Sequence, residues 1–167
     1  MNEKILYLDR DGVINKHIPY VGTLERFFWH NEIFEIVKYF TNKGFKIVIV
    51  TNQSGIQRGY YSLVDFTKIC IYMMSKFDEL GINIEIRACP HKPDQNCLCR
   101  KPNIGMFLDK RSKEDIMIGD QESDMKAAKN SGIENRWLIS NYINSNNATK
   151  IFLSHKDLLK DCLCDNL

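Results

Sequence analysis

The feature that most constrains the fold is a short apolar run near the start of the chain that ends in two closely spaced carboxylates. Ile5 to Leu8 has the length and the β-branched and aromatic content of a buried strand. Asp9 and Asp11 follow, and unpaired carboxylates are not tolerated in an apolar core. Residues two apart at a strand end can point to the same side. The pattern therefore predicts a strand that delivers both carboxylates to a sheet edge. The same residues are also good turn chemistry, so alone they indicate only a strand end.

Strand and helix signals alternate along the rest of the chain. Strands are expected at Phe45–Val50, Asn83–Ala88, Ile116–Ile118 and Arg136–Ile139, and helices at Asn31–Asn42, Ser62–Leu80, Ile104–Ser112, Glu122–Ser131 and His155–Leu163. A polar loop is expected at 141–149, after the last of these strands and before the last helix. This order predicts an α/β fold, a three-layer Rossmann-like sandwich with a mostly parallel sheet and helices on both faces.

Bulk properties limit the architecture and the class of function. The 167 residues suffice for one compact domain over positions 1–167 and are too few for two ordinary ones. A net charge of +2 argues against nucleic-acid binding, and no apolar stretch is long enough to span a bilayer. No signal-peptide pattern accompanies the six cysteines, so reduced or metal-bound thiols are expected. We expect a monomeric cytoplasmic protein, and Cys162 and Cys164 have no assigned role.

A second polar stretch follows the strand expected at 45–50. It reads Thr51-Asn52-Gln53-Ser54-Gly55-Ile56-Gln57-Arg58-Gly59. Hydroxyl, amide and main-chain N–H groups at a strand end can bind an anionic oxygen, and the glycines allow close approach. Arg58 has the planar guanidinium that suits a phosphate or carboxylate. A solvated turn with an incidental arginine would give the same pattern.

Two further segments carry charges to the same predicted edge. Lys101 precedes Pro102 and can neutralise a phosphoryl oxygen, although a Lys-Pro pair is also a common helix entry. Asp120 follows a short apolar strand, and with Asp9 and Asp11 it would complete an oxygen-rich site for Mg²⁺. Asp124 either favours a helix N-terminus or supports this site; its spacing favours support.

The most specific pattern is a cluster of metal-ligand residues between Cys89 and Pro102. Cys89, His91, Cys97 and Cys99 form C-x-H-x₅-C-x-C, the Cys₃His set of a closed tetrahedral zinc site. Four protein ligands leave no open position, so the sequence predicts a structural zinc that rigidifies this small loop at about 89–102. Chance clustering of four such residues is the alternative.

Together the four polar segments resemble the haloacid-dehalogenase-like phosphatase superfamily over about residues 4–133. The resemblance implies that Asp9 is the nucleophile and Asp11 the general acid and base. It further implies that Thr51 and Lys101 contact the phosphate and that Asp120 holds Mg²⁺. Aspartyl-phosphate formation and breakdown would split a very slow hydrolysis into two steps.

The zinc loop narrows the resemblance to the D-glycero-D-manno-heptose 1,7-bisphosphate phosphatases and the histidinol-phosphate phosphatases. The second polar stretch and the R-K-P-x-x-G-M run at 100–106 are similar to the heptose subfamily. The substrate-binding residues that this implies are His17, Tyr20, Asn52, Gln53, Ser54, Arg58, Arg100 and Gln121. Gln121 departs from the pattern, because a lysine commonly stands there. The implied reaction removes the C7 phosphate in nucleotide-activated heptose synthesis for lipopolysaccharide or other surface glycans.

Three alternatives remain open at this stage. Histidinol phosphate is the substrate of the other subfamily. A phosphoacceptor signalling module also places aspartates, a threonine and a lysine at strand ends, but it needs neither Asp11 as an acid and base nor a zinc loop. A zinc-dependent nucleic-acid binder is disfavoured by the near-balanced charge.

Overall fold

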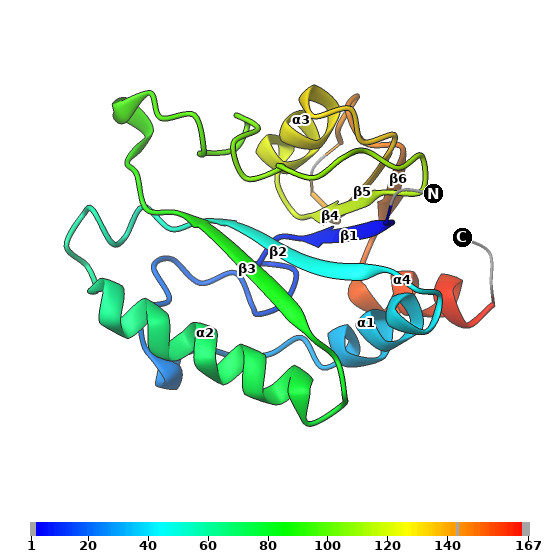
Figure 1. The fold of residues 1–167 in the computed structure, drawn as a ribbon, viewed down its shortest axis with the longest axis horizontal. Helices are drawn as coiled ribbons and strands as arrows, with labels where there is room; N and C mark the ends of the chain where they lie inside the picture. Colours follow the sequence, from blue (N-terminus) through cyan, green and yellow to red (C-terminus); the bar gives the residue numbers. More distant parts are fainter. Residues whose placement is uncertain (1–2, 143, 165–167) are drawn as a thin grey trace.

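The centre of the molecule is a six-stranded parallel sheet (Figure 1). The computed structural model describes residues 3–142 and 144–164. Its strands are β1 (Ile5–Leu8), β2 (Lys46–Asn52), β3 (Ile84–Cys89), β4 (Ile116–Gly119), β5 (Asn135–Ile139) and β6 (Lys150–Phe152). Their order is β3-β2-β1-β4-β5-β6, and every neighbouring pair is parallel. The winding direction therefore reverses between β1 and β4, where open α/β sheets bind ligands.

Helices cover both faces of the sheet (Figure 1). One face carries α1 (Glu32–Asn42), α2 (Leu63–Asp78) and α4 (His155–Leu163), and the other carries α3 (Glu122–Asn130). Two single turns of 3₁₀ helix, η1 (Leu24–Arg26) and η2 (Pro93–Gln95), lie in the connections. No helix within the described residues combines the length and the apolar character needed to cross a membrane. The predicted three-layer α/β sandwich is confirmed.

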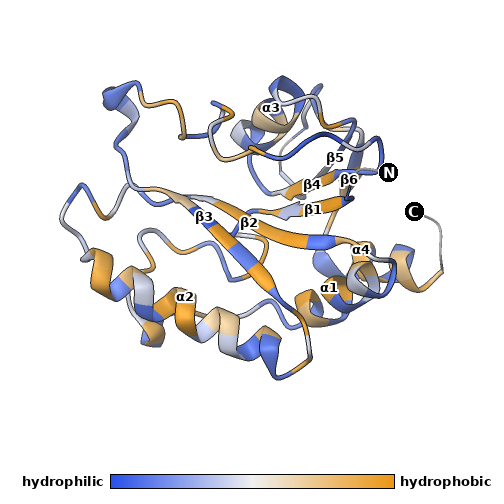
Figure 2. Ribbon diagram, in the orientation of Figure 1, coloured by the Kyte–Doolittle hydropathy of each residue, from blue (hydrophilic) through white to orange (hydrophobic). Residues whose placement is uncertain are grey.

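The apolar sequence of β1 (Figure 2) is explained by burial on both faces of the strand. Leu6 and Leu8 belong to the core beneath α1 and α2, whereas Ile5 and Tyr7 belong to the core beneath α3. All four are at most 1% exposed, because helices bury both faces of the strand. Truncating Leu8 to alanine would cost about 2–5 kcal/mol of stability, as in other cores.

The predicted helix at Ile104–Ser112 is wrong. This segment forms turns because its groups bond to other parts of the chain. Gly105 donates its N–H to the Leu98 carbonyl (2.9 Å), and the Met106 carbonyl accepts from Arg87 Nη1 (2.9 Å). The Asp109 carboxylate accepts hydrogen bonds from Arg87 and Tyr7, both at 2.7 Å. The segment thereby packs along the sheet beside the cysteine loop.

Two further differences concern strands. β6 was not predicted, because its three residues are too few to show a period. β2 runs two residues beyond the predicted Phe45–Val50, so Thr51 lies within a strand, paired in register with Ala88 of β3. This pairing fixes the main chain of a residue at the candidate site.

Candidate active site

The polar segments singled out in the sequence meet at the carboxyl ends of the central strands. Asp9 and Asp11 follow β1, Thr51 is the last residue but one of β2, and Asp120 follows β4. Asp9, Asp11 and Thr51 line a pocket of about 360 Å³, and Asp120 lies just beside it, hydrogen-bonded to the lining residues His17 and Gln121. Its lining comprises Asp9, Arg10, Asp11, His17, Ile18, Pro19, Tyr20, Thr51, Asn52, Gln53, Ser54, Gly55, Tyr61, Arg100, Lys101, Gln121, Ser123 and Asp124. The topology thus brings together residues from four separate segments.

Lys101 lies at the base of this pocket between two carboxylates. Its Nζ is 2.8 Å from Asp9 Oδ1 and 2.7 Å from Asp124 Oδ1, and it donates a third bond to the Val50 carbonyl at 2.6 Å. Its side chain is 1% exposed, whereas that of Asp9 keeps 10% of its surface exposed. Lys101 therefore fixes Asp9 Oδ1 from the buried side of the carboxylate.

Burial and charge act in opposite directions on these groups. Burial lowers the pKa of Lys101, but the charges of Asp124 and Asp9 outweigh it and raise that pKa above its ordinary value. Burial raises the pKa of Asp9 well above its ordinary value; Lys101 opposes this rise, and Asp124 and Asp120 add to it. Three carboxylates thus face a single buried ammonium, an excess of negative charge that a cation would relieve.

The acidic residues at this edge fit a divalent cation. Carboxylate oxygens of Asp9, Asp120 and Asp124 lie within 4.8 Å of one another. Asp120 Oδ2 accepts hydrogen bonds from His17 Nδ1 (2.8 Å) and Gln121 Nε2 (2.9 Å). Its Oδ1 is buried and has no hydrogen-bond partner among the described residues. Such an oxygen is costly to bury unless an ion binds it, and oxygen ligands are those that Mg²⁺ prefers.

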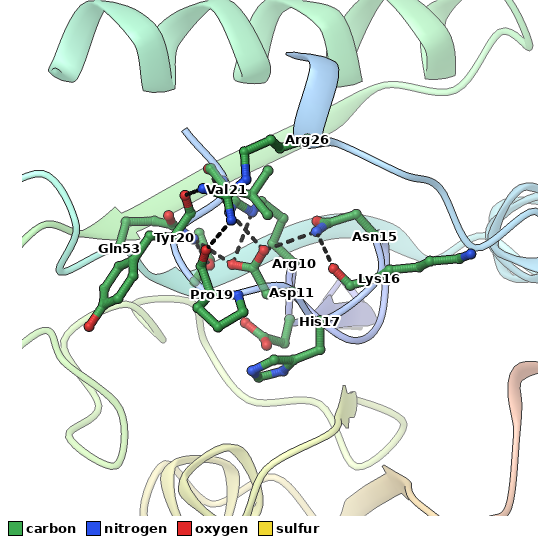
Figure 3. Close-up of polar contacts among 12 residues, drawn as sticks. Arg10, Asp11, Asn15, Lys16, His17, Pro19, Tyr20, Val21, Arg26 and Gln53 are labelled. Atoms are coloured by element: carbon green, nitrogen blue, oxygen red, sulfur yellow. Dashed lines mark hydrogen bonds and ion pairs between the residues drawn. The ribbon is translucent and has the colours of Figure 1, made fainter. Parts of the chain in front are cut away.

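Asp11 is held away from this acidic group by four donors (Figure 3). Its Oδ1 accepts from Arg10 Nη2 (2.7 Å) and Asn15 Nδ2 (3.0 Å), and its Oδ2 accepts from Arg10 Nε (3.1 Å) and Gln53 Nε2 (2.9 Å). The Arg10 side chain is 1% exposed, whereas that of Asp11 keeps 21% of its surface exposed, so the guanidinium holds Asp11 from its buried side. Both Asp11 oxygens are therefore committed to protein donors, and the predicted part of Asp11 in magnesium binding stays a prediction.

The other predicted substrate residues fall into three positions. Asn52 ties the second polar stretch to the cysteine loop, because it accepts from Lys101 N (3.0 Å) and donates to Lys101 O (3.1 Å). His17, Tyr20, Gln53, Ser54, Arg100 and Gln121 line the pocket. Arg58 is exposed and does not line it. A role for Arg58 in binding substrate within the pocket has no support from its position.

The four predicted zinc ligands form a second compact cluster beside the pocket. His91 Nδ1 lies 3.1 Å from Cys99 Sγ and 3.5 Å from Cys89 Sγ, and Cys97 Sγ lies 3.5 Å from Cys89 Sγ. Ligands of tetrahedral Zn²⁺, with bonds of about 2.3 Å to sulfur and 2.0–2.1 Å to nitrogen, lie about 3.5–3.8 Å apart. The cluster therefore fits a zinc ion.

Comparison with known proteins places the chain in a family. Residues 13–125 match the family described as polynucleotide kinase 3 phosphatase. The D-glycero-beta-D-manno-heptose-1,7-bisphosphate 7-phosphatase of Helicobacter pylori strain 26695 is 44% identical over 144 residues, which cover 81% of this chain and 83% of that protein. The D-glycero-alpha-D-manno-heptose-1,7-bisphosphate 7-phosphatase of Campylobacter jejuni is 41% identical over 166 residues, which cover 95% of each chain. This chain belongs to the heptose-bisphosphate phosphatases of the haloacid-dehalogenase-like superfamily.

A solved structure from the same family supports the assignment. The D,D-heptose 1,7-bisphosphate phosphatase of B. bronchiseptica, complexed with magnesium and phosphate, matches with a TM-score of 0.83 and 25% identity. The match covers 97% of this chain and 99% of that one. The predicted superfamily and subfamily are thereby confirmed, and as a member of this phosphatase family the chain is a phosphoric monoester hydrolase.

Sequence reasoning missed two residues of the site. Arg10 lies between the two aspartates, and its position alone gave no sign that its guanidinium turns inward to bind Asp11. Tyr61 lines the pocket from just before α2, and no motif in the sequence singles it out. For Asp124 the two readings left open are both right. Its Oδ1 pairs with Lys101, and its Oδ2 accepts from the Gln121 N–H at the start of α3 (3.0 Å).

Proposed function

We propose that this heptose-bisphosphate phosphatase removes the C7 phosphate of D-glycero-D-manno-heptose 1,7-bisphosphate through an aspartyl-phosphate on Asp9. The observation that carries the proposal is the position of Asp9 at the switch point of the sheet. One of its oxygens is fixed by buried Lys101, and its side chain borders the pocket. A carboxylate held in this way can approach phosphorus with its other oxygen.

The protein groups then have distinct tasks. Asp9 attacks phosphorus while the bond from phosphorus to the C7 oxygen breaks, and Asp11 gives that oxygen a proton. Asp11 next takes a proton from a water molecule that attacks the phosphorus of the aspartyl-phosphate, which releases phosphate and restores Asp9. Lys101 and the Thr51 hydroxyl stabilise charge on the phosphoryl oxygens.

Magnesium is assigned to the acidic group of the site. We propose Asp9 and Asp120 as its side-chain ligands, with the orphaned Asp120 Oδ1 as the supporting observation. When bound, Mg²⁺ supplies positive charge that reduces repulsion between an anionic phosphate and the Asp9 carboxylate. Zinc is assigned a structural role at Cys89, His91, Cys97 and Cys99, because a four-ligand site has no open position for substrate.

A bisphosphate is favoured over a monophosphate by the cation near the outer pocket. Arg100 lines the pocket, and the second phosphate of a bisphosphate would find a charged partner in its guanidinium. Histidinol phosphate carries an amine and an imidazole at its remote end and offers Arg100 no anion. Relatives named for both the alpha and the beta anomer exist, so we assign no anomer. We place the reaction in the cytoplasm, in the synthesis of nucleotide-activated heptose for surface glycans.

Turnover on a substrate panel tests this proposal. The alpha and beta anomers of heptose 1,7-bisphosphate, fructose 1,6-bisphosphate and histidinol phosphate are compared by kcat/KM with Mg²⁺ present, and ³¹P NMR identifies which phosphate leaves. We expect one heptose anomer to be preferred and C7 phosphate to be released. A higher kcat/KM for histidinol phosphate would refute the substrate assignment.

The covalent step needs its own variant. Asp9→Asn keeps the shape of the side chain but removes the nucleophilic charge, so turnover is expected to disappear while the fold is kept. Retention of more than a few per cent of the activity by this variant would exclude the aspartyl-phosphate.

A further inference from the structure

Tyr61 lies between two loops that line the pocket. Its ring lies against Gly22 and Gly55, so closely that a β-carbon at either glycine would lie within 2.4 Å of a Tyr61 atom. Gly22 follows the loop that contains His17 and Tyr20, and Gly55 belongs to the stretch after β2. The tyrosine is 9% exposed, so this position leaves its ring little freedom.

The Tyr61 hydroxyl begins a chain of hydrogen bonds that ends at Thr51. It donates to Gln53 Oε1 at 2.5 Å, and Gln53 Nε2 donates to Thr51 Oγ1 at 2.7 Å and to Asp11 Oδ2 at 2.9 Å. Gln53 is itself buried. All three residues of this chain line the pocket.

The direction of each bond follows from what its partners can offer. The Asp11 Oδ2 that faces Gln53 also accepts from Arg10 Nε (3.1 Å), so this oxygen is an acceptor, and Gln53 must turn its NH₂ toward Asp11 and Thr51. The amide oxygen then faces Tyr61, which must donate its proton. Burial raises the pKa of Tyr61 to about 12, so the hydroxyl keeps that proton at neutral pH.

The consequence falls on the proton of Thr51. Because its oxygen already accepts from Gln53, the hydroxyl proton must point elsewhere, and no protein acceptor holds it in the described part of the chain. We propose that Tyr61 is a positioning residue that acts through Gln53 to direct the Thr51 hydroxyl proton toward the transferring phosphoryl group. The inference rests on the proposed phosphatase mechanism.

A flipped Gln53 amide shows what Tyr61 prevents. Its oxygen would then face Thr51 and Asp11, and the Thr51 proton would be drawn to that oxygen and away from the phosphate. Loss of the Tyr61 hydroxyl lowers the penalty for this flip and leaves the amide oxygen without its buried partner. The effect should concentrate on the transition state, where negative charge on the phosphoryl oxygens is greatest.

The test compares Tyr61→Phe with a matched control. Tyr72→Phe also removes one hydroxyl with a hydrogen bond, from Trp29 Nε1 at 3.2 Å, but it lies on α2 away from the pocket. Activity is measured on p-nitrophenyl phosphate with Mg²⁺, and orthovanadate binding is measured by calorimetry. For Tyr61→Phe we expect kcat and vanadate affinity to fall by roughly tenfold with KM nearly unchanged. Tyr72→Phe is expected to retain both.

A double-mutant cycle identifies the route. In a Gln53→Leu background, Tyr61→Phe is expected to cause no further loss, because the relay is already broken. Additive losses, or wild-type kcat and vanadate affinity in Tyr61→Phe, would overturn the proposal. If Tyr61→Phe does not fold, a double-mutant cycle of Gln53→Leu and Thr51→Val replaces it, and additive losses in that cycle also overturn the proposal.

The test is independent of the substrate assignment, because neither p-nitrophenyl phosphate nor orthovanadate contains the sugar. A failed heptose assay therefore refutes the substrate and not this proposal, and vanadate binding tests the proposal even without turnover.

Discussion

Gly12 lies directly against Asp120. The Gly12 backbone has φ +90°, and a β-carbon at this position would come within 2.1 Å of Asp120 Oδ2. The glycine after the first aspartate pair therefore does more than allow a turn, because it leaves room for a carboxylate from a distant strand. A side chain at position 12 would occupy the space that the Asp120 carboxylate fills beside Asp9.

Gly12→Ala is expected to displace the Asp120 carboxylate and weaken magnesium binding at least tenfold. The half-saturating Mg²⁺ concentration for turnover measures this effect. Gly59→Ala is the matched control, because Gly59 also has a positive φ (+71°) but no atom within 4 Å of the added carbon. Equal Mg²⁺ requirements in the two variants would show that the close contact has no functional consequence.

Asp124→Asn should remove the second charge partner of Lys101. Breaking a buried ion pair typically costs about 3–5 kcal/mol, because the remaining charge is left unpaired. We expect a lower free energy of unfolding and a drop in kcat of at least tenfold. Asp65→Asn is the control: Asp65 accepts from the Ser62 N–H at the exposed start of α2 (3.0 Å), and loss of such a cap costs about 1 kcal/mol. Similar behaviour of the two variants would contradict a special role for Asp124.

The parts of the fold that could be predicted are those that leave a local pattern of apolar and polar residues in the sequence. Strand β1 and the carboxylates after it are visible in the sequence because burial on both faces demands a continuous apolar run. The helix predicted at 104–112 failed because Gly105 and Asp109 bond to residues far away in the chain. No local period reports such contacts.

The candidate site divides in the same way. Asp9, Thr51 and Asp120 are recognisable because each follows a predicted strand, and Lys101 because it stands in the Arg-Lys-Pro run that ends the cysteine loop. The inward turn of Arg10 and the link from Tyr61 to Gln53 depend on which side chains face each other across loops. Arg58 shows the converse, because a residue that fits a motif lies outside the pocket.

The zinc assignment predicts about one zinc per chain, as for a closed four-ligand site. Cys97→Ser should lower both thermal stability and phosphate affinity, since binding energy at such a site is also folding energy. Cys164→Ser is the control, because Cys164 is exposed and lies outside the cluster. Metal analysis, thermal unfolding and phosphate titration give the readouts. Metal-free protein with full activity and unchanged stability would end this assignment.

Arg100 lines the pocket, whereas Arg58 fits the sequence motif but lies outside the pocket, so substituting each tests whether position or motif decides substrate binding. Arg100→Ala is expected to raise KM for the heptose bisphosphate at least tenfold and to change KM for p-nitrophenyl phosphate much less, because the small aryl phosphate has no second anion. Arg58→Ala should leave both values within about twofold, as for most exposed side chains. If Arg58→Ala shows the larger and substrate-selective effect, the loop after β2 must close over the substrate in solution.

The stacked pair of His30 and His155 predicts how stability depends on pH. Their ring centroids are 3.8 Å apart, and the His155 Nε2–H donates to the Val13 carbonyl at 2.8 Å. The pKa of His30 is lowered to about 4, mainly by burial; the charges of His155 and Lys16 contribute to this lowering, and Glu32 opposes it. Burial also lowers the pKa of His155. Both imidazoles are therefore neutral in the folded protein at neutral pH.

The sign follows from proton linkage. The unfolded chain binds protons at these histidines near pH about 6.5, whereas the folded chain does so only at lower pH, so acid favours unfolding. Stability should be flat above pH about 7 and fall by on the order of 1 kcal/mol between pH 7 and 5 from His30 alone. Denaturant unfolding of wild type and His30→Phe, which keeps an aromatic ring against His155, measures the difference. A variant that loses stability between pH 7 and 5 as steeply as wild type would show that His30 does not titrate on unfolding.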